Sequence, residues 1–273
     1  MNIGIIGNGF VGAAVDNAFS SKGNKTFVYD SDRTRCKNSL EQTALESRFL
    51  FVCVPTPYDF ESACFDSSII DLVCSQLSEL RTGACIIIKS TVIPGTCDKL
   101  SKMYPHLRLI FAPEFLTERT ANEDFLNPSR IILGFDKNID YYQPVVSFFR
   151  ENFSHVPIIT TDYITSEFIK YFCNCFYATK ISIMNEFYQL ANALGVQWET
   201  ALQGLLSSGW VNKMHTQVPG PDGDFGFGGK CFPKDLKSFI KLFKDQNIDP
   251  VLLNAAWEKN SQIRTQKDWC KAE

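Results

Sequence analysis

The sequence has few histidines and no apolar run long enough to cross a membrane. Its three histidines, His106, His155 and His215, are far apart, and no cysteine–histidine pair has the short spacing of zinc ligands, so we expect no metal site. A spanning helix needs about 20 consecutive apolar residues, so no membrane contact is expected. Twenty-seven basic residues against thirty acidic ones give a net charge of −3, which argues against nucleic acid as a partner.

The sequence also lacks the regularly paired cysteines of a disulfide framework and the features of a secretory leader. Ten cysteines occur without the regular pairing of a disulfide framework, which indicates free thiols and a reducing compartment. The first expected strand begins at residue 2, with no basic leader or cleavage site before it, so a cytoplasmic protein is expected. A chain of 273 residues has room for one large domain or two of modest size.

The first half of the chain alternates between strand-like and helix-like segments. This alternation predicts an α/β domain over residues 1–160, a Rossmann-like, doubly wound parallel sheet with helices on both faces. The expected strands are 2–7, 26–30, 49–54, 84–89, 108–112, 130–134 and 156–160, and the expected helices are 11–22, 66–81, 95–103 and 140–151.

After Thr161 the strand signal stops, and residues 161–273 predict an all-helical central and dimerisation domain. Its main feature is a long helix over 162–195, capped by Thr161 or Asp162. Further helices are expected over 197–207, 233–246 and 250–268. The long helix carries more aromatic residues than one face needs, which favours a homodimer, although the other helices of its own domain are an alternative cover for them.

The N-terminal strand ends in the pattern Gly7-Asn8-Gly9-Phe10-Val11-Gly12, and Asp30 follows about 20 residues later. In a dinucleotide site the first glycine makes a tight turn, the second lets the backbone approach the pyrophosphate, and the third lets helix pack on strand. The helix N–H groups then bind the pyrophosphate. A carboxylate at Asp30 can hold the ribose hydroxyls of NAD and would repel the phosphate of NADP, although Arg33 and Arg35 lie nearby.

A second glycine-rich segment, Gly228-Gly229-Lys230-Cys231-Phe232-Pro233-Lys234-Asp235, sets one cysteine just before an expected helix start. Proline is favoured in the first helical turn, so Cys231 is expected beside the positive end of the helix dipole, where a thiolate is favoured. Asp235 is near enough to orient a water or take a proton. The alternative for Cys231 is a buried structural cysteine, which is what most of the ten cysteines are expected to be.

Polar residues in apolar surroundings complete the candidate site. Lys170 and Asn174 share a face of the long helix, either as functional groups or as a solvated stripe. Glu114 and Glu118 are also four apart, and either is a candidate general acid or base, although most glutamates are surface residues.

These motifs together resemble the UDP-glucose/GDP-mannose dehydrogenase family, along residues 2 to about 265. The segments that carry the resemblance are 7–12, Val54-Pro55-Thr56-Pro57, Ser90-Thr91-Val92-Ile93-Pro94-Gly95-Thr96, Pro113-Glu114-Phe115-Leu116, Asn127-Pro128-Ser129-Arg130 and, most specific, 225–235. The resemblance implies a four-electron oxidation of a sugar alcohol to a uronic acid. In it, a first NAD accepts one hydride, Cys231 forms a thiohemiacetal, and a second NAD accepts another hydride, which leaves a thioester on Cys231.

The resemblance also implies individual roles. Catalytic roles fall on Cys231, Lys170, Asn174, Asp235, Glu118 and Thr91. Cofactor contacts fall on Gly7, Gly9, Phe10, Val11, Gly12, Asp30, Arg35, Thr56, Thr91, Glu118 and Lys234. Nucleotide-sugar contacts fall on Glu114, Phe115, Leu116, Lys170, Asn174, Gly220, Asp222, Asp224, Phe225 and Gly228. The long helix would form the core of a homodimer.

Departures from the family pattern leave the identity of the nucleotide-sugar substrate undetermined. The family's third, UDP-binding domain is not part of this sequence, which therefore reads as a short form. A loop arginine of the family has no counterpart between Arg150 and Arg264. UDP-glucose is the leading substrate; GDP-mannose or a UDP-N-acetylhexosamine is the alternative with the same chemistry. A related hydroxy-acid dehydrogenase would need no cysteine, and a non-catalytic NAD-binding partner subunit is the alternative from another class.

Overall fold

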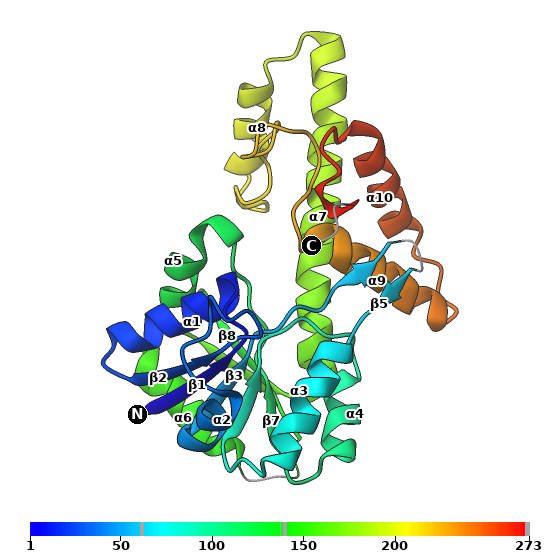
Figure 1. The fold of residues 1–273 in the computed structure, drawn as a ribbon. Helices are drawn as coiled ribbons and strands as arrows, with labels where there is room; N and C mark the ends of the chain where they lie inside the picture. Colours follow the sequence, from blue (N-terminus) through cyan, green and yellow to red (C-terminus); the bar gives the residue numbers. More distant parts are fainter. Residues whose placement is uncertain (61–62, 137, 139–140, 271–273) are drawn as a thin grey trace. The chain divides into compact units, whose positions relative to one another are not determined.

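The computed structural model describes residues 1–60, 63–136, 138 and 141–270. The chain separates into two compact units (Figure 1), one made of Met1–Pro57 with Phe65–Lys170, the other of Tyr58–Cys64 with the chain from Tyr171 onward. The division falls inside the long helix after Lys170 rather than at residue 160. Residue 140 and residues 271–273 of the ranges expected from the sequence lie outside the described residues.

The first unit is built on a seven-stranded sheet in the order β2-β1-β3-β6-β7-β8-β9. Its strands are β1 (Asn2–Ile6), β2 (Lys25–Tyr29), β3 (Phe49–Val52), β6 (Cys85–Ile88), β7 (Arg108–Phe111), β8 (Ile131–Gly134) and β9 (Ile158–Thr161). The two central strands β3 and β6 are buried at every residue, which explains their unbroken apolar sequence. The α/β, Rossmann-like fold expected from the sequence is confirmed.

One pair of strands differs from the wholly parallel sheet that the alternation predicts. β8 runs antiparallel to β7, with Phe111 opposite Gly134, and β9 runs parallel to β8. The connection from β7 to β8 holds only the 3-10 turn η1 (Glu118–Thr120) and the short helix α5 (Ala121–Leu126). Only the last residue of β8 lies opposite the last residue of β7, so the antiparallel β8 begins beyond the carboxyl end of β7. Residues 112–130 therefore stay at the carboxyl edge of the parallel strands, where ligands bind in such sheets.

Helices cover both faces of this sheet. They are α1 (Phe10–Ser21), α2 (Leu40–Glu46), α3 (Ser68–Glu79), α4 (Thr96–Met103), α5 and α6 (Tyr142–Asn152). The ring of Phe148 on α6 stacks on Phe49 of β3 and contacts Phe19 of α1, so α1 and α6 share one face. Right-handed crossovers direct α3 and α4 to the other face, where they lie side by side (Figure 1).

The second unit is helical. It contains most of α7 (Tyr163–Leu194), with α8 (Trp198–Ser207), α9 (Phe232–Asp245), α10 (Val251–Ile263) and the 3-10 turn η2 (Asp268–Cys270). The segment from Tyr58 to Cys64 joins this unit, although it comes from the first half of the chain. It contains β4 (Tyr58–Asp59), which pairs with β5 (Cys64–Phe65), and Phe60 stacks on Trp257 of α10.

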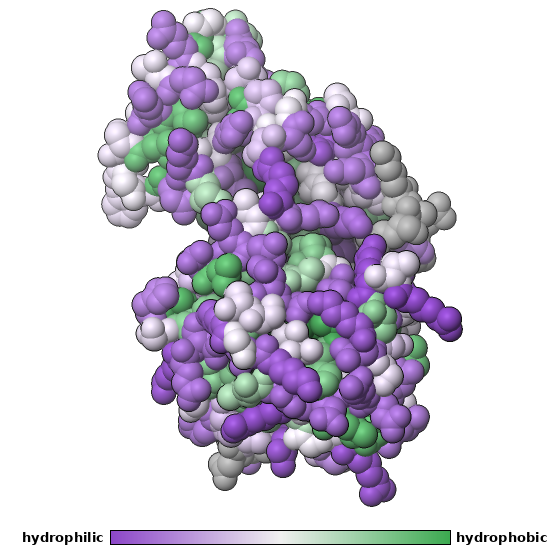
Figure 2. Space-filling model, turned by 60° about the vertical axis from the view of Figure 1, so that its left-hand side comes forward, coloured by the Kyte–Doolittle hydropathy of each residue, from purple (hydrophilic) through white to green (hydrophobic). Residues whose placement is uncertain are grey.

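One face of the molecule is largely polar. In the face that Figure 2 shows, hydrophilic side chains dominate and hydrophobic areas are small and separate. Among the described residues, no helix has the length and apolar character needed to span a membrane.

Candidate active site

The glycine loop between β1 and α1 has the geometry needed for close approach of a phosphate group. Gly7 has a φ of +89°, and a side chain there would lie 2.7 Å from the carbonyl oxygen of Cys53. A side chain at Gly12 would lie 1.9 Å from the carbonyl oxygen of Gly7. At Gly9, by contrast, an added Cβ would meet nothing within 4 Å. Phe10 and Val11 begin α1, whose N-cap residue offers no side-chain acceptor, so the helix N-terminus suits an anionic pyrophosphate.

Asp30 follows β2 and contacts this glycine loop. Its Oδ2 atom accepts a hydrogen bond from the backbone N–H of Asn8 at 2.5 Å, and its Oδ1 atom accepts one from the N–H of Asp32 at 2.8 Å. The side-chain amide of Asn8 donates to the carbonyl oxygen of Arg35 at 2.8 Å, and the Asn8 Oδ1 atom is buried without a protein partner. The loop therefore brings Asp30 and the backbone of Arg35, two expected ribose contacts, next to the glycines.

Hydrogen bonds join the turns that follow β3 and β6. The hydroxyl of Thr56 donates to the carbonyl oxygen of Thr91 at 2.8 Å, and the hydroxyl of Ser90 donates to the carbonyl oxygen of Val54 at 2.7 Å. Thr56 and Thr91 are both buried. The structure thus brings two expected cofactor contacts together at the carboxyl edge of the sheet.

Glu114 and Lys170 form a buried ion pair within the first unit. The side chains of Lys170 and Glu114 are 3% and 6% exposed, and Lys170 Nζ lies 2.9 Å from Glu114 Oε1. The same ammonium donates to the backbone carbonyl of Glu114 at 2.5 Å, and Glu114 Oε2 accepts from the N–H of Leu116 at 2.7 Å. Phe115 lies below the ammonium, with its ring centroid 5.3 Å from Nζ. Four residues expected to act at one site are therefore in contact.

Lys89, which is not among the expected site residues, adds a second buried ammonium to this cluster. It follows β6 and donates to the carbonyl oxygen of Pro113 at 3.2 Å. Lys89 and Lys170 therefore hold successive carbonyls of the Pro113–Glu114 segment. Burial lowers the pKa of Lys89 to about 8, and the nearby charge of Glu114 acts in the opposite direction.

Glu167 is a second buried group missed in the sequence. It lies in the first turns of α7 and accepts hydrogen bonds from the N–H groups of Gly95 and Cys97 at 2.6 and 2.8 Å. Burial raises the pKa of Glu167 to about 7, while these N–H donors oppose the shift. Glu167 thereby connects α7 to the start of α4, in the same segment as Thr91.

Glu118 has a different environment from Glu114. It begins η1 and is exposed to solvent, whereas Glu114, four residues earlier, is buried in the lysine cluster. The structure therefore separates the two carboxylates that the sequence placed four residues apart.

Cys231 occupies the N-cap of α9, and Pro233 lies in the first turn. The carboxylate of Asp235, one turn further, is buried and receives two hydrogen bonds. Asn174 Nδ2 donates to its Oδ2 atom at 2.6 Å, and Lys234 Nζ donates to its Oδ1 atom at 2.6 Å. Within the second unit, the expected catalytic residues Asn174 and Asp235 are therefore in direct contact, and Lys234 is paired with Asp235.

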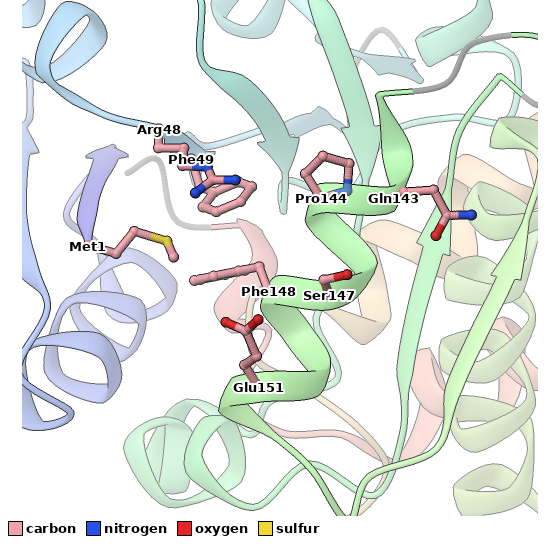
Figure 3. A pocket seen from close by; sticks show the side chains of 8 residues that line it. All are labelled: Met1, Arg48, Phe49, Gln143, Pro144, Ser147, Phe148 and Glu151. Carbon is pink, nitrogen blue, oxygen red and sulfur yellow. The ribbon is translucent and has the colours of Figure 1, made fainter.

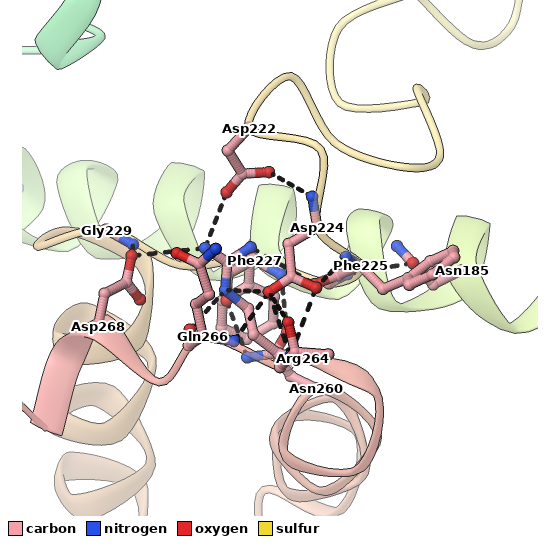
Figure 4. Close-up of polar contacts among 12 residues, drawn as sticks. Asn185, Asp222, Asp224, Phe225, Phe227, Gly229, Asn260, Arg264, Gln266 and Asp268 are labelled. Carbon is pink, nitrogen blue, oxygen red and sulfur yellow. Dashed lines mark hydrogen bonds and ion pairs between the residues drawn. The ribbon is translucent and has the colours of Figure 1, made fainter.

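The loop before Cys231 is fastened by side chains from α7, α10 and the segment after α10 (Figure 4). Asn185 Oδ1 accepts from the N–H of Gly226, and the Asn260 side chain bonds both backbone polar groups of Phe227. The expected substrate contacts on this loop are Gly220, Asp222, Asp224, Phe225 and Gly228. Of these, Asp222 and Asp224 bind the segment 264–266, and the N–H of Gly220 donates to the carbonyl of Asp224.

In the first unit, a hollow of about 300 Å³ lies at the amino ends of the strands of the sheet, opposite the carboxyl edge described above (Figure 3). It is lined by Met1, Arg48 and Phe49, which precede or begin strands, and by Gln143, Pro144, Ser147, Phe148 and Glu151 of α6. It lies away from the glycine loop and contains none of the expected site residues. Among the residues that the structure describes, no group of three or more His, Cys, Asp or Glu side chains is arranged to hold a metal ion.

Comparison with known proteins places both units in one family. Residues 31–149 match the NAD-binding domain of the UDP-glucose/GDP-mannose dehydrogenase family, and residues 164–262 match its central domain. A UDP-glucose 6-dehydrogenase of Rickettsia conorii is 30% identical over 237 residues, which cover 85% of this chain and 53% of that protein. The chain therefore spans about half the length of this relative.

Solved structures show the same fold. A UDP-glucose dehydrogenase from Pyrobaculum islandicum superposes with a TM-score of 0.82 at 23% identity, over 96% of this chain and 68% of that one. The 3-hydroxyisobutyrate dehydrogenase of Mycobacterium tuberculosis gives a TM-score of 0.74 at 16% identity, over 96% of this chain and 92% of that one. The fold alone is therefore compatible with either dehydrogenase.

Proposed function

Because the chain belongs to the UDP-glucose/GDP-mannose dehydrogenase family, we propose that it oxidises the primary alcohol of a nucleotide sugar to a carboxylate, with NAD as the cofactor. The leading substrate is UDP-glucose and the product UDP-glucuronate. The observation that carries the proposal is Cys231 at the N-cap of α9, with Asp235 one turn beyond it. A helix N-terminus favours a thiolate, and a dehydrogenase that stops after one hydride transfer has no need of a nucleophile.

In the proposed mechanism, the residues that hold NAD are the glycines of the first loop and Asp30. Two NAD molecules, bound one after the other, would each accept one hydride, one in each oxidation step. The Cys231 thiolate adds to the carbon of the sugar aldehyde, forming a C–S bond and an oxyanion that is protonated to a thiohemiacetal. Oxidation of that carbon leaves a thioester on Cys231. Water then adds to the acyl carbon, the C–S bond breaks, and the thiolate and a carboxylate are released.

The neighbouring polar groups have separate tasks in this mechanism. The Lys170 ammonium stabilises negative charge that develops on oxygen, as a fixed cation does in a site of low dielectric. Asp235 orients the water of the last step, and Asn174 holds the Asp235 carboxylate in place through the 2.6 Å hydrogen bond. Glu118, exposed on η1, serves as the base for that water, and Thr91 supports the same water network.

Purified protein with excess NAD and limiting UDP-glucose tests the proposal. We expect about two NADH per sugar, because the alcohol loses four electrons. One NADH per sugar would mean that oxidation stops at the aldehyde and would contradict the thioester mechanism. No NADH with UDP-glucose, GDP-mannose or a UDP-N-acetylhexosamine, with NAD binding intact, would instead support a non-catalytic NAD-binding subunit.

The open side of Gly9 gives a prediction for NAD binding. Gly9→Ala places a Cβ where no protein atom lies within 4 Å and where φ is −76°. The variant should therefore fold with a loss of about 0.5–1 kcal/mol, because alanine is a poorer N-cap than glycine. Its NAD affinity should fall by at least about tenfold, since the methyl group occupies the path of the pyrophosphate.

Calorimetric titration with NAD, together with urea unfolding, measures both effects. Gly83→Ala is the matched control, since an added Cβ there also meets nothing within 4 Å and lies away from the loop. Unchanged NAD affinity in the Gly9 variant would contradict the assignment of this loop to the cofactor.

We also propose a homodimer formed through α7. Large apolar side chains are exposed along the whole helix at spacings of three, four and seven residues, which keep them on one side: Ile164, Phe168, Phe172, Phe176, Ile183, Phe187, Leu190 and Leu194. A two-fold dimer would bury this stripe against its own copy.

We further propose a cytoplasmic location. None of the cysteines whose side chains are described forms a disulfide, which supports it. Cell fractionation that recovers the protein outside the cytoplasm would overturn this proposal.

Phe187→Glu should convert the dimer to a monomer. Each lost phenylalanine removes about 2 kcal/mol of apolar burial, and the symmetry of the interface doubles the loss, so dimer affinity should fall more than about a hundredfold. Light scattering after gel filtration should give about twice 30.9 kDa for the natural sequence and about 30.9 kDa for the variant. Leu72→Glu, at an exposed leucine of α3, is the control that should stay dimeric. A monomeric natural protein would refute the proposal.

A further inference from the structure

Arg264, directly after α10, is a buried arginine among three carboxylates. Its side chain is 3% exposed. Its Nη2 atom lies 2.8 Å from Asp222 Oδ2 and 3.4 Å from Asp268 Oδ2, and its Nε atom lies 3.9 Å from Asp224 Oδ2. The guanidinium also donates to the carbonyl oxygens of Gln266 and Phe225, at 3.0 and 3.4 Å. An arginine with this many acceptors holds several chain segments in one fixed arrangement.

The guanidinium also packs directly against the backbone of the loop that precedes Cys231. A Cβ atom at Gly228 would be 2.2 Å from Nη2 and 2.4 Å from the guanidinium carbon, so the arginine occupies the space of a side chain at that position. Asp268, which contacts Arg264, accepts a hydrogen bond from the N–H of Gly229 at 2.8 Å (Figure 4). Arg264 therefore packs on the backbone three residues before Cys231, and its partner Asp268 binds the backbone two residues before it.

Asp224 joins the same loop to the two residues that follow Arg264. Its Oδ2 atom accepts from the hydroxyl of Thr265 at 2.9 Å and from the backbone N–H groups of Thr265 and Gln266 at 3.1 and 2.9 Å. Burial would raise the pKa of Asp224, but these donors and the Arg264 charge hold it below its usual value. The acceptor capacity of this carboxylate is thus used mainly by the protein itself.

We propose that Arg264 is a positioning residue for Cys231, and that Asp222 and Asp224 fasten the loop rather than bind the nucleotide sugar. The loop reaches Cys231 in a fixed conformation because Arg264 and Asp268 hold its backbone on both sides of Gly228. The inference rests on the proposed function only in taking Cys231 as the nucleophile. It assigns to the loop carboxylates a task that differs from the substrate contacts expected from the sequence.

Iodoacetamide labelling of the full chain tests the positioning, followed by mass spectrometry of the Cys231 peptide relative to the peptide of the exposed Cys64. Arg264→Met removes the charged hydrogen bonds that hold the loop. Since about 1 kcal/mol corresponds to a fivefold change in a local equilibrium, Cys231 should be labelled at least about fivefold faster than in the natural sequence. Lys259→Met, on α10 and bonded to Gln189, is the matched control and should leave the ratio unchanged.

Asp222→Asn extends the test to a milder variant, because that side chain is 49% exposed and its loss should leave folding intact. With a nucleotide sugar that the enzyme oxidises, both Arg264→Met and Asp222→Asn should lower kcat about tenfold and change KM less than about twofold. Arg264→Lys, which keeps the charge but not the planar fork, should recover part of kcat.

The proposal is overturned by an unchanged labelling ratio in both Arg264→Met and Asp222→Asn. It is also overturned if Asp222→Asn raises KM about tenfold at constant kcat, the result expected of a substrate ligand. If Arg264→Met does not fold, Asp222→Asn decides between these outcomes. The labelling ratio needs no turnover, so it decides the positioning role even if no nucleotide sugar is oxidised.

Discussion

Replacement of Cys231 by alanine is expected to abolish uronic acid formation and to slow steady NADH production by at least about a thousandfold. The second oxidation needs a carbon that carries both a hydrogen and a bond to sulfur, and alanine offers no atom for that bond. The remaining groups, Asn174 and Asp235 among them, keep their mutual hydrogen bond, so folding should be preserved. Stopped assays of NADH and of the acidic product measure the two consequences separately.

The control for this variant is Cys64→Ala, which removes an exposed thiol from a different segment. It should keep about two NADH per sugar. If Cys231→Ala still produces the carboxylate at the natural rate, the covalent mechanism is wrong, and a single-hydride dehydrogenase of the same fold becomes the better interpretation.

Replacement of Lys170 by methionine is expected to lower the free energy of unfolding by about 3–5 kcal/mol. The change leaves the Glu114 carboxylate buried beside Phe115 with its closest counter-charge removed, and it deprives the Glu114 carbonyl of its donor. The double variant Lys170→Met/Glu114→Gln should recover much of the loss, because a neutral amide replaces the uncompensated charge. Urea unfolding followed by circular dichroism measures all three proteins.

Lys37→Met is the matched control in the same unit. Lys37 also forms an ion pair at short range, 2.6 Å from Asp16, but its side chain is 58% exposed, so its loss should cost less than about 1 kcal/mol. If Lys170→Met is as stable as Lys37→Met, the cluster is more open to water than its burial indicates. If it is both stable and fully active, its proposed catalytic role is also excluded.

Much of the first unit follows from local sequence. All seven strands of the large sheet were expected within a few residues of their positions, because each is a short apolar run between turn residues. α2 and α5 were missed, since seven and six residues are too few for helical periodicity to be distinctive. The antiparallel β8 was also missed, because strand direction depends on where the connecting segment passes, and the sequence of Ile131–Gly134 does not show this.

The candidate site was predictable only in part. Glycine spacing located the loop of Gly7 and Gly9, and a proline in the first turn located Cys231, since both patterns are local. Lys89 and Glu167 gave no such signal, because each looks like an ordinary charged residue until its burial is known. Arg264 has local partners in Gln266 and Asp268. Its bonds to Phe225 and Asp222, however, join residues 39 and 42 positions apart, and local sequence does not indicate them.

The segment from Tyr58 to Cys64 determines how this protein can be divided for experiments. The chain enters the second unit after Pro57, returns at Phe65 and enters it again after Lys170. A single cut after Lys170 would therefore yield an N-terminal fragment that still carries Phe60, now without the indole of Trp257 on which it stacks. An expression clone for the dinucleotide-binding half should replace residues 58–64 with a short polar linker. A clone for the helical half, from Tyr171 onward, should be studied with residues 58–64 added as a separate peptide.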